Sequence, residues 1–153
     1  MKTQSENINP ADFQLSRHFR LSEFTRSATA IRYGIDNTPD ADSIEALQNL
    51  CINVLEPLRE HFGAIRITSG YRCPEVNEKI GGALRSQHMF GEAADIHCGS
   101  LERGRKMYNF VVENLDFDQM LLEMKGNVLH CLHISYSCRY ENRHRVTSNY
   151  QIK

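Results

Sequence analysis

Hydrophobic residues recur at helical spacing between residues 44 and 62 and predict a long amphipathic helix there. Pro57 lies inside this stretch and is expected to kink the helix, because proline has no backbone N–H to donate. Gly63 is expected to end the helix, and Pro39 to occupy a first helical position upstream. Ser22 is interpreted as the cap of a shorter helical turn. The apolar face of the long helix is formed by Ile44, Leu47, Leu50, Cys51, Val54, Leu55, Leu58 and Phe62.

Alternating apolar and polar residues predict strands in the second half of the chain. Lys125-Gly126-Asn127 is expected to join the last two strands as a hairpin turn. The pattern also predicts a short helix over residues 74–80 and a longer helix capped by Ser100. Helices come first, and strands and helices follow with short connections, which favours antiparallel pairing in a compact α+β domain. The strands are expected over residues 65–69, 93–98, 117–123 and 128–136.

Composition narrows the classes of protein to consider. The chain has 153 residues, of which 41% are hydrophobic and 24% charged, with a net charge of -1. This is typical of one globular domain. The sequence also lacks the basic stripe that nucleic-acid-binding proteins usually carry. No apolar run reaches the roughly 20 residues of a membrane span. Residues 1–10 are polar and contain no secretory signal, so we expect synthesis in the cytoplasm and exit from the cell only by lysis or another signal-free route.

The same pattern divides the chain into three parts. Residues 1–15 are polar and are expected to be loose, and residues 16–138 to form the domain. Residues 139–153 are expected to be a poorly ordered polar tail without periodicity.

The five cysteines are odd in number and include no Cys-x-x-Cys pair, so neither a disulfide framework nor a cysteine-rich zinc site is expected.

Candidate chemistry begins in the segment Ser86 to Asp95, which reads SQHMFGEAAD. Its small residues allow a tight turn, so that His88 and Asp95 can approach one ion. Asp95 lies at the entry to an apolar strand, where an unpaired carboxylate would be costly and a metal ion would remove that cost. His97 shares a strand face with Asp95 by period two and is an alternative ligand.

The last predicted strand supplies a further histidine. Leu132, Ile134 and Tyr136 alternate as a core face, so His133 belongs to the opposite face and can point into a polar site. Histidine nitrogen and aspartate oxygen are ligands that zinc accepts. Three such ligands leave a fourth position for water, which is typical of catalytic zinc sites rather than structural ones.

The motif Ser-x-His-x-x-Gly-x-Ala-x-Asp of residues 86–95 resembles the zinc-binding motif of the M15 peptidases, the D-alanyl-D-alanine carboxypeptidase and L-alanyl-D-glutamate endopeptidase group. Ser69-Gly70-Tyr71-Arg72 is similar to an upstream element of that family, and His133-Ile134-Ser135 to its final ligand strand. The resemblance covers about Leu21 to Tyr136 and is closest to the compact, endolysin-like branch found in phage and prophage genes.

The resemblance implies a fold shared with the Hedgehog signalling domain, in which helices pack on one side of an antiparallel sheet. It implies Zn²⁺ held by His88, Asp95 and His133, with Arg72 binding the substrate and its oxyanion and Ser86 as a substrate-binding candidate. The implied function is hydrolysis of peptidoglycan stem peptides by zinc-activated water, as a D,D-carboxypeptidase or an L,D-endopeptidase. The alternative is a non-catalytic zinc-containing peptidoglycan-binding or phage structural module.

The general base is where the chain departs from the family. Many members carry a carboxylate three residues before the last ligand, where this chain has His130, and others a histidine two residues before, where it has Cys131. His130 is the first candidate base, but strict alternation turns it away from His133 unless the strand is irregular. Glu123 is the second; in a regular hairpin Asp118 or Gln119 faces His133, and Glu123 lies roughly 13 Å away.

Overall fold

The computed structural model describes residues 13–148, which contain a five-stranded sheet in the order β1-β2-β4-β3-β5. The neighbouring pairs β1–β2, β2–β4 and β3–β4 are antiparallel, whereas β3 and β5 are parallel. The expectation of an α+β fold is confirmed, but that of a wholly antiparallel sheet is wrong. The strands are β1 (Arg66–Ser69), β2 (Ala93–His97), β3 (Gln119–Lys125), β4 (Val128–Ser135) and β5 (Arg145–Ser148).

The predicted long helix is present and has a change of helical geometry in its middle. It consists of α3 (Ala41–Leu50), the π-helical turn η3 (Cys51–Leu55) and α4 (Glu56–Phe62). Pro57 lies in the first turn of α4, just after the π turn, and prolines and π turns are both common places for a helix to bend. Gly63 ends α4 as expected. Pro39 does not occupy the first helical position. Asp40 caps α3, because its carboxylate accepts the Ser43 N–H.

Short helices surround one end of the sheet. In α1 (Leu21–Thr25) the expectation that Ser22 caps the helix is wrong. The cap is Arg20, whose backbone N–H donates to the Glu23 carboxylate at 2.7 Å. The helix α2 (Ala28–Tyr33) was not predicted, because it has little apolar periodicity and is defined by its caps Ser27 and Gly34. The remaining short helices are α5 (Pro74–Lys79) and the 3-10 turn η4 (Gln87–Phe90).

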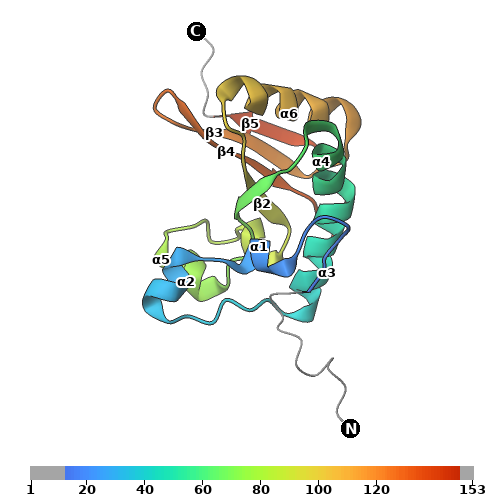
Figure 1. Ribbon diagram of the computed structural model, residues 1–153. Helices are drawn as coiled ribbons and strands as arrows, with labels where there is room; N and C mark the ends of the chain where they lie inside the picture. The colour runs from blue at the N-terminus through green and yellow to red at the C-terminus, as the bar shows by residue number, and fades with distance from the viewer. Residues whose placement is uncertain (1–12, 149–153) are drawn as a thin grey trace.

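The sheet has one core face and one polar face. The longest helix, α6 (Leu101–Asn114), is capped by Ser100 as expected, and it packs on β3 and β4 with α4 beside it (Figure 1). Alternation divides β2, β3 and β4 in this way: their buried apolar side chains point to the helices, and the opposite face carries mostly polar side chains together with Leu121. The core face includes Ile67, Ile96, Met120, Leu122, Leu132 and Ile134, all buried.

The segment after β4 is part of the fold, which corrects the expectation of a poorly ordered tail from residue 139. Residues 136–144 pass the beginning of β3, where the His144 N–H donates to the Phe117 carbonyl, and β5 then pairs with β3 from Gln119↔Arg145 onwards. At the other end, Leu15 is buried, so the ordered domain extends into the segment expected to be loose, whereas residues 1–12 and 149–153 lie outside the described structure. Between residues 13 and 148, no helix is long and apolar enough to cross a membrane.

Candidate metal centre

Asp95 and His133 face each other across two neighbouring strands. They are direct partners in the β2–β4 register, and both side chains point to the polar face of the sheet. The His133 Nδ1 and Asp95 Oδ1 atoms lie 2.8 Å apart. Both side chains remain partly accessible, with 23% and 16% of their surfaces exposed. The sheet therefore fixes two of the three expected ligands by backbone pairing alone.

His88 comes to the same point from η4. Its ring is almost fully buried, and Nδ1 donates to the Gly70 carbonyl at 2.6 Å. This bond leaves the Nε2 lone pair available, and Nε2 lies 3.4 Å from Asp95 Oδ1. Gly70 can take this place because a Cβ there would lie 2.6 Å from Phe24 Cα. A backbone carbonyl that fixes the histidine tautomer in this way is typical of metal sites.

The donor set fits a zinc ion. One ligand atom from each of His88, Asp95 and His133 can be chosen so that all lie within 4.8 Å of one another. Zinc binds nitrogen and oxygen at about 2.0–2.2 Å, which separates two ligand atoms of a tetrahedron by roughly 3.3–3.6 Å. Among the described side chains, His88 Nε2 is also a buried nitrogen without a hydrogen-bond partner. His97, the alternative ligand, is exposed and is not part of this cluster.

The electrostatics of the cluster keep Asp95 ionised. Burial by itself would raise the pKa of this carboxyl, but the hydrogen bond from His133 and the two neighbouring imidazole rings lower it well below its usual value. A carboxylate beside two imidazole rings thus presents the charge and the lone pairs that a divalent metal requires.

Arg72 lies at the edge of the cluster. One guanidinium nitrogen donates to Asn77 Oδ1 at 3.0 Å, while Nε is buried and has no hydrogen-bond partner among the described residues. Burial lowers the pKa of Arg72, and the nearby carboxylates of Asp95 and Glu123 oppose that effect. The guanidinium is therefore charged, close to the metal ligands, and has donor capacity left for another molecule.

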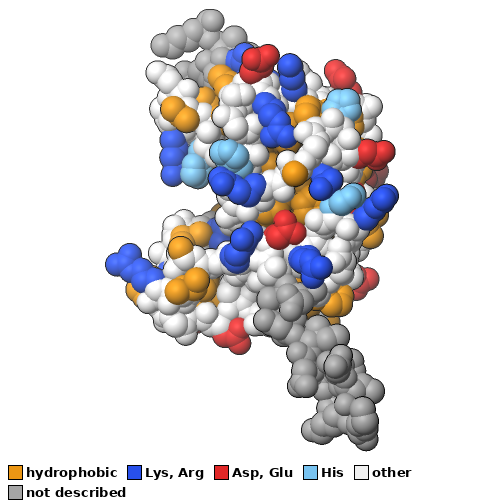
Figure 2. Space-filling model, viewed as in Figure 1, with side chains coloured by type: hydrophobic (Ala, Val, Ile, Leu, Met, Phe, Trp, Pro, Cys, Tyr) orange, Lys and Arg blue, Asp and Glu red, His pale blue; other side chains and the backbone are white. Residues whose placement is uncertain are grey.

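A pocket of about 360 Å³ joins these groups. It opens on the polar face of the sheet, and Figure 2 shows the molecule hollowed between the part that carries the β3–β4 hairpin and the part that carries α2 and α5. A larger cavity of about 640 Å³ between α3 and the residues after His88 contains none of the three ligands. The 360 Å³ pocket is lined by Arg72, Gly82, Ala83, Arg85, Ser86, Gln87, His88, Asp95, Gln119, Leu121, Glu123 and His133.

The hairpin is irregular, and this changes the choice between the two candidate bases. Glu123 pairs with Cys131 and Met124 with Leu129, so His130 is the extra residue of a β-bulge. The bulge leaves His130 exposed and outside the pocket lining. Neither Asp118 nor Gln119 faces His133, as a regular hairpin would require; Leu121 does.

The bulge places Glu123 closer to the cluster than a regular hairpin would. Directly opposite Cys131, it is a diagonal neighbour of His133, a spacing of roughly 7–8 Å between Cα atoms instead of the expected 13 Å. Its carboxylate lines the pocket and accepts a hydrogen bond from the Cys131 thiol at 3.3 Å. Burial raises the pKa of Cys131, which keeps the thiol protonated as a donor.

The remaining expectations concern Ser86 and the cysteines. The Ser86 hydroxyl accepts the His88 N–H and thereby caps η4, and the residue also lines the pocket. All five cysteines lie within the described residues and are free; four are buried and Cys138 is exposed.

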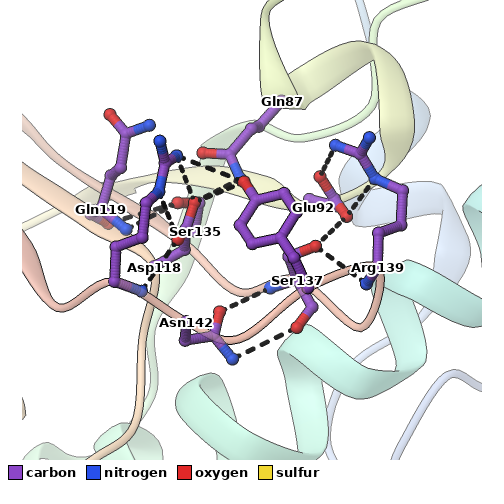
Figure 3. A network of polar contacts seen from close by, with 10 residues as sticks. Gln87, Glu92, Asp118, Gln119, Ser135, Ser137, Arg139 and Asn142 are labelled. Carbon is purple, nitrogen blue, oxygen red and sulfur yellow. Dashed lines mark hydrogen bonds and ion pairs between the residues drawn. The ribbon is translucent and has the colours of Figure 1, made fainter.

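Sequence reasoning missed a network of charges next to the site. Glu92 and Asp118 are buried carboxylates that bind Arg139 and Arg143 from the supposed tail (Figure 3). The available signal was weak: Glu92 stands in the motif between two small residues, and Asp118 precedes a strand. Their arginine partners lie 47 and 25 residues away, and spacing gave no reason to pair them.

Two imidazoles and a carboxylate around one point, beside a half-buried arginine and a further carboxylate, are typical of a mononuclear zinc hydrolase. A family model of peptidase M15 matches residues 17–132. The chain therefore belongs to the M15 peptidases, and the expectation of a zinc metallopeptidase is confirmed.

A curated relative is similar over a shorter stretch. The chain is 40% identical over 48 residues to the zinc D-Ala-D-Ala carboxypeptidase of Streptomyces albus G. The matched region is 30% of this chain and 19% of that protein. The similarity thus covers a small part of the relative.

Proposed function

We propose that this chain hydrolyses peptide bonds in the stem peptides of bacterial peptidoglycan, with a zinc ion held by His88, Asp95 and His133. The observation that carries the proposal is the convergence of these ligand atoms, all within 4.8 Å, in one pocket with Arg72 and Glu123. The named activity of the Streptomyces relative supports the substrate class, since a terminal D-Ala-D-Ala dipeptide is part of such stems.

The three ligands have distinct tasks. Zinc, when bound, supplies a Lewis acid and lowers the pKa of its water to about 7. Asp95 contributes the negative charge, while the Gly70 carbonyl holds the His88 ring in the tautomer that offers Nε2. His133 is held by backbone pairing with Asp95. The site therefore needs little rearrangement to accept the ion.

Glu123 is the general base in this proposal. It lies on the polar face, one diagonal step from His133, and is a pocket carboxylate that is not among the three ligands. It accepts a proton from the attacking water and then delivers it to the leaving amine nitrogen. The Cys131 thiol, which donates to one Glu123 oxygen, orients the carboxylate. The other oxygen is free of that bond and available for proton transfer.

Arg72 binds the oxygen on which negative charge develops. Its unpartnered Nε and its position beside the metal ligands suit this role, because a fixed donor is worth most where charge appears in the transition state. Arg85 lines the same pocket and offers donors to a carboxylate of the substrate. A peptide with a terminal or side-chain carboxylate near the cut bond fits this charge distribution.

The test is digestion of purified peptidoglycan by the zinc-loaded chain, with mass spectrometry of the soluble products. We expect free amino acids or short peptides and intact glycan. Free D-alanine would identify a D,D-carboxypeptidase, and cleavage between L-alanine and D-glutamate an L,D-endopeptidase. The matched control is His88→Ala, which should release nothing. Cut sugars, or no products from several peptidoglycan types, would favour a non-catalytic zinc-containing module instead.

A further inference from the structure

Two buried carboxylates lie beside the loop that carries His88, and neither belongs to the proposed catalytic machinery. Asp118 is 0% exposed and Glu92 is 2% exposed. Each is paired with an arginine from residues 137–143, named here the C-terminal brace (Figure 3). Burying such pairs generally stabilises a fold no more than apolar packing would, so their presence next to the site points to a positioning role.

The first contact of the brace is made through Asp118. Arg143 donates to both carboxylate oxygens, at 2.9 and 2.8 Å, and its backbone N–H adds a third bond. The Tyr140 hydroxyl donates to Asp118 Oδ2 at 2.8 Å. The same oxygen accepts the Gln87 side-chain amide at 2.9 Å. Gln87 is the residue immediately before His88, so this network ends on the ligand loop.

The second contact is made through Glu92. Arg139 donates to both oxygens of this carboxylate, at 3.0 and 2.8 Å, and Ser137 donates to one at 2.7 Å. The Arg139 guanidinium also stacks 4.3 Å above the Phe90 ring. Bidentate arginine–carboxylate pairs fix orientation as well as distance. The residues after His88 are therefore attached to the same short segment of the chain as Gln87.

Both contacts flank one small turn. The Glu92 N–H donates to the Gln87 carbonyl, which closes residues 87–92 into a loop with His88 inside it. The η4 turn has only four residues, and a helix this short contributes little order of its own. A ligand that must stay within about 0.5 Å of its productive position needs support from outside the turn.

We propose that Arg139 and Arg143 are positioning residues for the zinc site: through Glu92, and through Asp118 and Gln87, they hold the His88 loop in its metal-binding conformation. This inference rests on the proposed zinc ligands. It assigns the C-terminal brace to the metal centre, although none of its residues lines the pocket.

Gln87→Ala is the decisive variant for the first contact, because it breaks the bond from Asp118 to the loop while Asp118 keeps Arg143 and Tyr140 and Glu92 keeps Arg139. We expect the zinc dissociation constant, measured by competition with a chromogenic chelator, to rise by about 10-fold or more. The matched control is Ser100→Ala, which removes the cap of α6. It should lower the unfolding temperature and leave zinc affinity unchanged.

The role of Arg143 is tested by amide hydrogen exchange of the His88 loop and by the zinc affinity of two Arg143 variants. Arg143→Ala should increase amide hydrogen exchange of residues 86–92 in the metal-free protein and weaken zinc binding. Arg143→Lys keeps the charge without the bidentate geometry, and should restore zinc affinity only in part.

Failure of this inference is distinct from failure of the proposed function. If the wild-type chain binds zinc tightly and Gln87→Ala binds it equally well, the positioning role of Arg143 through Asp118 and Gln87 is overturned and the zinc site stands. Wild-type zinc affinity in Arg139→Ala would overturn the role of Arg139 through Glu92 in the same way. Zinc loss in Ser100→Ala equal to that in Gln87→Ala would also overturn it, because general destabilisation would then explain both. A wild-type chain that binds no zinc would overturn the site itself.

Discussion

Glu123 shows how much one extra residue in a strand changes a site. The sequence identified this carboxylate as a candidate base, but regular hairpin spacing placed it too far from His133. The β-bulge at His130 shifts the register, so that Glu123 faces Cys131 and points into the pocket. Bulges depend on local ladder geometry and leave no periodic signal. The three side chains that converge, His88, Asp95 and His133, were by contrast candidates from one motif and from strand alternation.

Replacing Glu123 by glutamine tests its assignment as the base. The change removes the proton acceptor with little change in shape, so we expect kcat to fall by roughly 10²–10⁴ while zinc content stays at the wild-type value. His130→Ala is the control, since the exposed bulge residue lies outside the pocket lining. Steady-state kinetics and elemental analysis measure both quantities. Loss of turnover in His130→Ala, with full turnover in Glu123→Gln, would reverse the assignment.

Asp118 predicts a specific pH dependence of stability. Burial would raise the pKa of this carboxyl, but hydrogen bonds from Arg143, Tyr140 and Gln87 lower it below its usual value. Because the unfolded-state pKa is about 3.9, ionised Asp118 stabilises the fold above that pH. The stabilisation is lost as the pH falls through the lower folded-state pKa.

Urea unfolding of the wild type and of Asp118→Asn at a series of pH values measures this effect. The wild type should have the larger free energy of unfolding near pH 7, and the difference should narrow below about pH 3.9. A difference that stays constant down to the acid limit would show that the Asp118 charge does not stabilise the fold.

The turn that carries His88 is held by its last residue as well as by the brace. Gly91 ends η4 with a φ of 72°, and a Cβ at this position would lie 2.2 Å from the Ser43 carbonyl oxygen in α3. Glycine adopts a positive φ without strain and has no Cβ to clash with α3, so it lets the turn pack directly against that helix. The glycine of the metal-binding motif is thereby explained by backbone packing.

Gly91→Ala should destabilise the protein more than Gly99→Ala. Gly99 has a φ of 84°, but a Cβ added there would meet no atom within 4 Å, so alanine at this position adds only conformational strain, about 1–2 kcal/mol. Alanine at Gly91 adds the same strain and a clash with α3. Chemical denaturation of the two variants gives the comparison. Equal losses in free energy of unfolding would show that the α3 contact relaxes without cost.

Periodicity predicted the larger elements and failed for elements that depend on distant partners. The helix over residues 44–62 and the β3–β4 hairpin follow from apolar spacing and turn residues in the sequence. The strand β5 does not: it has four residues, and Val146 at its centre is 43% exposed. It forms because it pairs with β3 and because preceding arginines bind Glu92 and Asp118. Those partners could not be identified from local sequence.

Zinc removal is expected to destabilise the whole molecule, since the proposed ligands lie on η4, β2 and β4. A ligand that binds only the native state adds RT ln(1 + [L]/Kd), about 2.7 kcal/mol at a free zinc concentration 100 times Kd. Calorimetry should therefore show a lower Tm in EDTA and recovery when zinc is added back. In His88→Ala the Tm should not respond to EDTA. An unchanged wild-type Tm after complete zinc removal would contradict the coupling of metal binding to folding.

The arrangement of the entire chain brings the site together from five separate segments. Arg72 follows β1, while His88 comes from η4 and Asp95 from β2, and Glu123 and His133 come from the hairpin. The sequence could predict which of these residues are chemically suited to bind zinc. It could not predict their distances, because these depend on strand order and on the bulge.

The most direct test of the zinc site is an anomalous difference map collected at the zinc absorption edge from crystals of the zinc-loaded protein. We expect one strong peak within about 2.0–2.2 Å of ligand atoms of His88, Asp95 and His133, with an open coordination position towards Glu123 and Arg72. A peak at His97 or at other side chains, or no peak at these three residues in zinc-loaded crystals, would contradict the assignment.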